Sequence, residues 1–110
     1  MPRPKKLRFI SGSTEVGSYI PENVEPTGVI DLSMEGLEAI RLTDYEKLDQ
    51  ETAAQRMGVS RQTYGRVLAQ ARQAVATALV TRQRLRIDGG AYCLGSPGHG
   101  RQRRRHRGWK

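Results

Sequence analysis

Apolar residues recur at the spacing of an amphipathic helix between residues 33 and 81, where the chain predicts three helices. The first follows Ser33, a suitable N-cap, and is expected to run to about Tyr45. Leu37 and Ile40 stand on one face of this helix, so we expect both side chains to be buried. The fold class predicted from this pattern is mainly α.

A second helix is predicted between Asp49, which caps its start, and Gly58, which can take the left-handed conformation that ends a helix. A third helix follows Ser60 and extends to about Val80, roughly 30 Å at 1.5 Å per residue. The inward-facing positions of the second helix are Ala53, Ala54 and Met57. The apolar positions of the third are Tyr64, Val67, Leu68, Ala71, Val75 and Leu79.

The contact between the second and third helices fits a helix-turn-helix, in which two short helices cross at a steep angle. Ala54 is small enough for a close contact, and Gly58 permits the tight turn. Val59 and Tyr64 can fill the space between the helices, and Val67 extends this seam. About six requirements for small, apolar or glycine residues are met together, which favours this unit strongly.

The segments on either side of the helices look less regular. Residues 1–32 contain four prolines, so we expect an irregular N-terminal arm with at most a short strand from Leu7 to Ile10. Residues 82–94 alternate apolar residues with arginines before a Gly-Gly turn, which predicts a small β-hairpin. The helix-turn-helix domain would span 33–81, and residues 95–110 would form a disordered Arg-rich tail.

The distribution of charge supports a nucleic-acid partner. The net charge is +8 and the isoelectric point is about 10.4, which favours binding to a polyanion. Residues 11–60 carry ten acids against three bases, whereas residues 61–98 carry six arginines against one acid. The sign of the charge therefore changes at Arg61, where the third helix is predicted to begin.

The polar face of the third helix is the candidate surface for sequence-specific DNA contact. Arginine can bind guanine through two hydrogen bonds, glutamine can bind adenine in the same way, and hydroxyl groups suit phosphates. A solvated helix face is the simpler explanation for any one of these side chains, but Arg61, Gln62 and Arg66 together favour DNA. The candidate DNA-binding residues are Ser60, Arg61, Gln62, Thr63, Gly65, Arg66 and Gln73.

Gly65 is unexpected inside a helix, because glycine there costs about 1 kcal/mol relative to alanine. One interpretation is that the missing Cβ lets the helix backbone approach the DNA closely. The other is that glycine relieves crowding beside Tyr64. The sequence leaves both open.

Both ends of the chain are rich in basic residues, which predicts sequence-independent and salt-sensitive contact with phosphates. As flexible arms these segments could also enter the minor groove. The residues expected to contact phosphates are Arg3, Lys5, Lys6, Arg101, Arg103, Arg104, Arg105 and Arg107.

Other classes of function find little support. Cys93 is the only cysteine, which fits a reducing compartment, and with His99 and His106 it lacks the paired spacing of a zinc site. No run of apolar residues is long enough to cross a membrane, and no signal peptide is expected. We therefore expect a cytoplasmic protein that is not an enzyme and needs no metal or cofactor.

Two resemblances support these interpretations. The stretch from Leu37 to Leu79 resembles the C-terminal helix-turn-helix region, region four, of bacterial sigma factors. Nearly the whole chain, residues 1–92, resembles a family of small prokaryotic proteins described as predicted DNA-binding proteins. The shared segments are the opening Met-Pro-Arg-Pro, the helix Leu37–Leu42, Gly58–Arg61, Tyr64–Arg66 and the Leu-Arg-Ile-Asp-Gly-Gly of residues 85–90.

The resemblance implies a sigma-like helix-turn-helix, a role in transcription, and DNA contact by Arg61, Gln62 and Arg66. We therefore expect a protein that binds double-stranded DNA in the major groove and regulates transcription. The alternative is a protein-interaction adaptor, for example on RNA polymerase, with a basic tail that binds nucleic acid non-specifically. A homodimer that spans two half-sites remains open, as do the target sequence and the direction of regulation.

Overall fold

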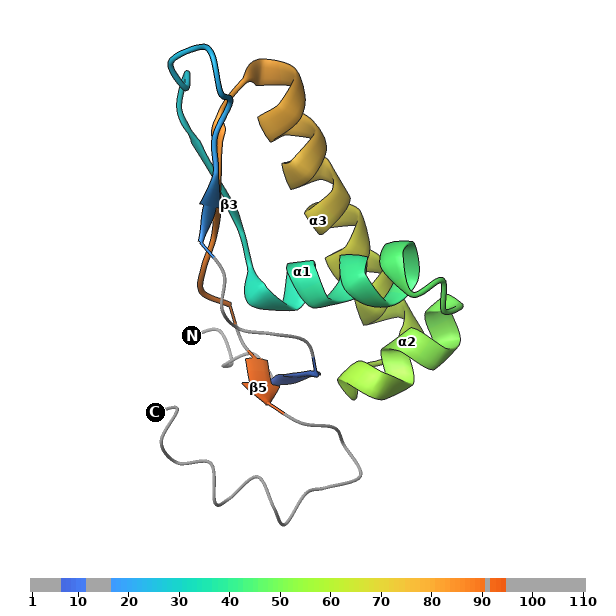
Figure 1. Cartoon of the computed structure of the whole chain (residues 1–110). Coiled ribbons are helices and arrows are strands. Elements are labelled where there is room, and N and C mark those ends of the chain that lie inside the picture. Colours follow the sequence, from blue (N-terminus) through green and yellow to red (C-terminus); the bar gives the residue numbers. More distant parts are fainter. Residues whose placement is uncertain (1–6, 12–16, 91, 95–110) are drawn as a thin grey trace, which may run out of the picture.

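The chain is mainly helical with a small three-stranded sheet in the computed structural model, which describes residues 7–11, 17–90 and 92–94. The helices are α1 (Met34–Ile40), the π-helix η1 (Arg41–Tyr45), α2 (Gln50–Met57) and α3 (Arg61–Thr81). The strands are β1 (Arg8–Ile10), β2 (Ser18–Tyr19), β3 (Val29–Leu32), β4 (Arg84–Ile87) and β5 (Tyr92–Leu94). Figure 1 shows the long α3 beside the sheet, with α1 crossing it and α2 at its N-terminal end.

The predicted helix starts are confirmed, because each is capped by the side chain expected to do so. Ser33 Oγ accepts a hydrogen bond from the Gly36 N–H at 3.0 Å. The Asp49 carboxylate accepts from the Thr52 N–H at 2.7 Å, and Ser60 Oγ caps α3 in the same manner.

The first helix runs to Tyr45 as predicted, but its last five residues form a π turn. In this wider turn the Glu46 N–H donates to the Arg41 carbonyl at 2.8 Å, a spacing of five residues. The apolar spacing alone does not distinguish this turn from a regular α-helical one.

The helices enclose a core in which Tyr64 has the central position. Its side chain is fully buried among apolar residues of α1, η1, α2 and α3. Its hydroxyl donates to the Ala39 carbonyl at 2.8 Å and also bonds to Thr43 Oγ1. The other buried members of this cluster are Ala39, Leu42, Ala53, Ala54, Met57 and Leu68.

The predicted hairpin over residues 82–94 is wrong. β4 lies between β2, to which it is antiparallel, and β3, to which it is parallel, while β5 pairs with β1 in a separate parallel pair. Gly89 and Gly90 have φ angles of 78° and 97°. They carry the chain past the start of α1, where the Met34 N–H donates to the Gly89 carbonyl, instead of folding it back.

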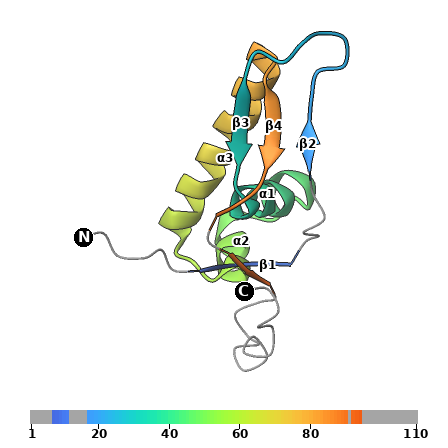
Figure 2. The same ribbon diagram turned by 90° about the vertical axis from the view of Figure 1, so that its left-hand side faces the viewer.

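The N-terminal arm is more regular than expected, because its described residues include β1, β2 and β3. Only the short strand at Leu7 to Ile10 was predicted, and β1 confirms it at Arg8–Ile10. Prolines and glycines exclude a helix in this segment but allow an extended chain. Its strand β3 pairs with β4, although 50 or more residues separate the two strands. Figure 2 shows β3, β4 and β2 side by side with α3 behind them. A second buried cluster joins the strands to the helices, and its members are Ile10, Leu32, Met34, Ala71 and Ile87.

Leu79, one of the apolar positions of the third helix, is 74% exposed. The sheet and the C-terminal half of α3 are separated by an apolar groove of about 710 Å³. Leu37 and Ile40 line this groove, and for that reason they are only half-buried. None of the described helices is long and apolar enough to cross a lipid bilayer.

Candidate nucleic-acid interface

The turn between α2 and α3 holds the two helices in a fixed relation. Gly58 has a φ of 70°, the left-handed conformation predicted for it, and its N–H donates to the Ala54 and Gln55 carbonyls. The Val59 N–H donates to the Ala54 carbonyl at 3.1 Å. Since Ser60 caps α3, each residue between the two helices is held by a hydrogen bond to α2 or α3. The direction of α3 relative to α2 is therefore well determined.

Ser60 and Thr63 were both expected to contact phosphates, but their hydroxyls differ in availability. Ser60 Oγ accepts from the Thr63 N–H and donates to Thr63 Oγ1, both at 3.0 Å. Ser60 has therefore used its proton within the cap. The Thr63 hydroxyl accepts at this contact, and its own proton remains available to an acceptor outside the cap.

The candidate residues of α3 occupy a wide arc of the helix, with Gln62 and Gln73 exposed at its centre. Arg61 and Arg66 lie on opposite sides of this arc, because five residues correspond to about 140° around the axis. Arg61 lies next to α2, where it lines a hollow with Asp49 and Glu51. Arg66 lies toward β1 and β3.

The Asp49 carboxylate lies near Arg61 without forming an ion pair with it. A hydrogen bond from the Thr52 backbone N–H lowers the pKa of Asp49, and the nearby charge of Arg61 lowers it further. Arg61 is therefore exposed beside two acidic residues of the α2 start, Asp49 and Glu51.

Arg66 is one of the arginines of the described residues that form no ion pair. Arg8, Arg41, Arg72 and Arg86 each form an ion pair with a carboxylate. Among the described residues, the exposed Arg66 guanidinium has no carboxylate within ion-pair distance. A guanidinium without a partner keeps all five N–H donors for a base edge or a phosphate.

Gly65 is half-buried beside the start of α2. Apart from the sequence neighbours of Gly65, a Cβ at this position would meet only Gln50 Oε1, at 3.7 Å, which is an ordinary contact. No other element of the fold therefore requires glycine here.

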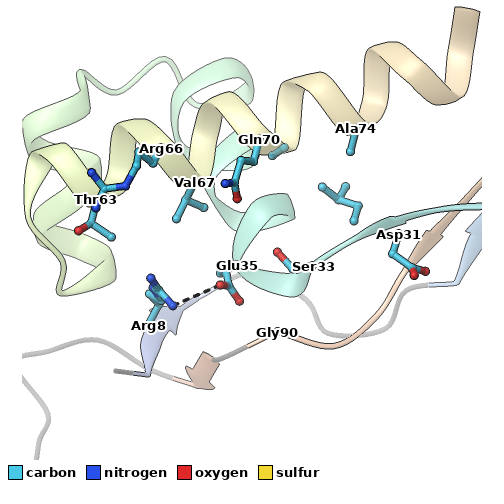
Figure 3. A pocket seen from close by; sticks show the side chains of 12 residues that line it. Arg8, Asp31, Ser33, Glu35, Thr63, Arg66, Val67, Gln70, Ala74 and Gly90 are labelled. Carbon is cyan, nitrogen blue, oxygen red and sulfur yellow. Dashed lines mark hydrogen bonds and ion pairs between the residues drawn. The ribbon is translucent and has the colours of Figure 1, made fainter. Parts of the chain in front are cut away.

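A cleft of about 440 Å³ adjoins the Arg66 side of α3. Thr63, Arg66 and Gln70 line it from α3, and Arg8 and Glu35 line it from β1 and α1 (Figure 3). Sequence reasoning missed Arg8, Glu35 and Gln70 as members of one site. The segments that supply them are far apart in the chain, and no local pattern brings them together.

Comparison with known proteins identifies the family of this chain. Over residues 1–94 the sequence matches the family described as "Protein of unknown function DUF134". The chain belongs to this family. Within DUF134, the matched region includes every described element, from β1 to β5.

Relatives of this DUF134 chain occur in bacteria and in an archaeon. A UPF0251 protein of Thermoanaerobacter pseudethanolicus is 43% identical over 115 residues, covering 99% of this chain and 97% of the relative. One of Rhodospirillum rubrum is 42% identical, covering 86% of this chain and 68% of the relative. One of Methanothermobacter thermautotrophicus is 38% identical, covering 84% of this chain and 49% of the relative. No solved structure matches the DUF134 chain.

Several predicted residues of the DUF134 chain lie outside the described residues. Among them are His99, His106 and the phosphate-contacting set Arg3, Lys5, Lys6, Arg101, Arg103, Arg104, Arg105 and Arg107. Within the described part of the chain, no three His, Cys, Asp or Glu residues are grouped as metal ligands. The predictions for the basic ends therefore remain predictions.

Proposed function

We propose that this protein binds double-stranded DNA sequence-specifically through a sigma-like helix-turn-helix formed by α2 and α3, and that it regulates transcription. The observation that supports this best is the combination of the tight turn at Gly58 with an exposed face of α3 that bears Gln62 and Arg66, an arginine with no ion pair to the described residues. Long polar donors on a rigid helix immediately after such a turn are suited to base edges in the major groove.

The geometry revises which residues would contact bases. Gln62, Arg66 and Gln73 are the proposed contacts, because they are exposed on one side of α3. Arg61 would instead contact a phosphate next to α2, where it offsets the charge of Asp49 and Glu51. The basic ends would add affinity that is independent of sequence.

The decisive experiment selects bound duplexes from a random pool and then measures variants on the enriched site. Arg66→Ala is expected to weaken binding to that site by about 1–3 kcal/mol and to relax the preference at one base pair. Arg84→Ala is the matched control, because Arg84 is also exposed and forms no ion pair with a described residue, but it lies in β4, away from this face. Equal losses from both variants, or no enriched sequence at all, would contradict the proposal.

Deletion of residues 99–110 separates the sequence-independent affinity for DNA from the sequence-specific affinity. We expect weaker binding to all duplexes alike and a smaller dependence on salt, because six basic residues are removed. A loss of sequence preference in this truncated chain would place the specificity in the tail instead of α3.

The protein-interaction adaptor is the second candidate, and the apolar groove between the sheet and α3 favours it. Tyr19, Ile20 and Leu79 line this groove and are more than half exposed, which is typical of a protein-binding surface. If the selection enriches no duplex while Leu79→Asp abolishes a protein complex and leaves the fold intact, the adaptor replaces the DNA-binding proposal.

A further inference from the structure

Arg8 lines the cleft beside Arg66 and has a buried hydrogen-bond donor without an acceptor among the described residues. The Arg8 side chain is only 13% exposed, and a single 3.4 Å contact joins its Nη1 to the Glu35 carboxylate. Its Nε lies buried with no hydrogen-bond partner among the described residues. A buried donor that stays unsatisfied costs about 1–3 kcal/mol, so a shift of the Arg8 side chain that brings Nε to an acceptor in the cleft would be favourable.

Three further side chains that line the cleft also present donors. Arg66 has no ion-pair partner among the described residues, and the exposed Gln70 amide and the Thr63 hydroxyl each have a proton to donate. The two carboxylates of the cleft are paired, Glu35 with Arg8 and Asp31 with Arg86. Once these pairs cancel, the charge left in the cleft is the positive charge of Arg66.

The size and the walls of the cleft suit a small organic molecule. Its volume of about 440 Å³ lies within the usual range for ligand pockets, roughly 300–1,000 Å³. Val67, Ala71 and Ala74 form an apolar wall on α3. A ligand would thus place its oxygens against Arg8 and Arg66 and its carbon skeleton against α3.

We propose that this cleft binds a small organic anion, a carboxylate or phosphate ester, and that the bound anion competes with DNA for Arg66. The first half depends only on the cleft, whereas the second rests on the proposed DNA-binding function. A duplex is too wide to enter a cleft of this size, so the largely buried Arg8 side chain suits a small ligand better than the DNA backbone. The anion would act as an effector that lowers DNA affinity.

The first test is a titration of the full chain with sodium succinate and, separately, with inorganic phosphate, in the absence of DNA. The reporters are the NMR resonances of the Arg8 Nε–H and of the Thr63, Gln70 and Gly90 backbone amides. We expect saturable shifts of these signals with at least one anion. Shifts confined to the basic ends, or an Arg8 Nε–H signal that moves only with duplex DNA, would overturn the proposal.

Variants of α3 provide the matched controls. Ala74→Leu fills the cleft and should weaken anion binding about tenfold or more, whereas Ala76→Leu, on the exposed face, should not. Gln70→Ala removes a donor from an exposed position and should weaken binding without affecting the fold. Unchanged affinity in both cleft variants would contradict the assignment.

The second test measures DNA affinity at a saturating concentration of the same anion and constant ionic strength. We expect weaker DNA binding by the wild type and no change for Ala74→Leu. If the anion binds in the cleft but DNA affinity is equal with and without it, the competition is refuted. If no duplex is bound specifically, the DNA-binding function fails, while the titration still decides the anion site.

Discussion

The buried Tyr64 hydroxyl donates a hydrogen bond to the Ala39 carbonyl oxygen at 2.8 Å, which ties α3 to α1 just before the π turn. A tyrosine has one hydroxyl proton, so at the second contact the Thr43 hydroxyl must be the donor. Burial raises the pKa of Tyr64, which keeps the hydroxyl protonated at neutral pH. The orientation of α3 against α1 thus depends on a polar bond inside the apolar core.

Tyr64→Phe is expected to lower the free energy of unfolding by about 1–3 kcal/mol, because it leaves the Thr43 hydroxyl and the Ala39 carbonyl without this partner. Urea denaturation measures the change. Tyr45→Phe is the control, since Tyr45 is 79% exposed and should tolerate the loss of its hydroxyl. Equal stability of the two variants would show that the buried bond contributes nothing.

Gly89 and Gly90 permit a direct comparison of backbone strain with side-chain collision. Both have positive φ, so alanine at either position should cost about 1–2 kcal/mol. A Cβ at Gly90 would lie 2.3 Å from Glu35 Oε1, whereas one at Gly89 would meet nothing within 4 Å. Gly90→Ala should therefore cost a further 1–3 kcal/mol or so, because Glu35 must move away from Arg8. Thermal unfolding of both variants measures their stability, and a smaller loss of stability in Gly90→Ala than in Gly89→Ala would refute this expectation.

Gly65→Ala distinguishes an internal role of this glycine from a role in binding. The fold offers a Cβ only ordinary contact with Gln50. Because alanine has the better helix propensity, the variant should have a free energy of unfolding about 1 kcal/mol higher than the wild type. If α3 approaches DNA closely here, affinity for the selected duplex should fall at the same time. The opposite changes in stability and affinity are the expected signature. Unaltered affinity would show that DNA does not need glycine at this position.

Glu38 should make stability dependent on pH under acidic conditions. Burial by itself raises the pKa of Glu38, but hydrogen bonds from Arg41 and Ser11 outweigh it and hold the pKa below its ordinary value of 4.5. A carboxylate with a lowered folded pKa contributes stability that is fully present above its unfolded pKa. That stability is lost as the pH falls from about 4.5 through the folded pKa.

Urea unfolding between pH 7 and pH 3 checks this expectation. Glu38→Gln should be less stable than the wild type at pH 7, and it should lose less stability on acidification. Glu22→Gln, at an exposed position outside this network, should keep the acid dependence of the wild type. An identical acid dependence in Glu38→Gln would exclude Glu38 as its source.

The sequence by itself determined the local structure of residues 33–81, because the signals there act within one or two helical turns. Ser33, Asp49 and Ser60 cap the helices through bonds to residues three positions ahead, and Gly58 ends α2 through its own backbone freedom. Tyr64 was placed in the core by periodicity alone. The polar face of α3, with Gln62 and Arg66, follows from the same period.

Only the tertiary structure decided the strand pairing and the surroundings of each charge. β4 alternates apolar and basic residues as a hairpin strand would, but its partners are β2 and β3. The Gly-Gly segment after β4 predicts pairing with the next residues of the chain, and it contains no information about pairing with distant segments. Arg61 and Arg66 look equivalent in sequence, but the fold places Arg61 beside Asp49 and Glu51 and Arg66 in the cleft next to Arg8. Contacts between distant segments depend on how whole elements pack, which local propensities do not encode.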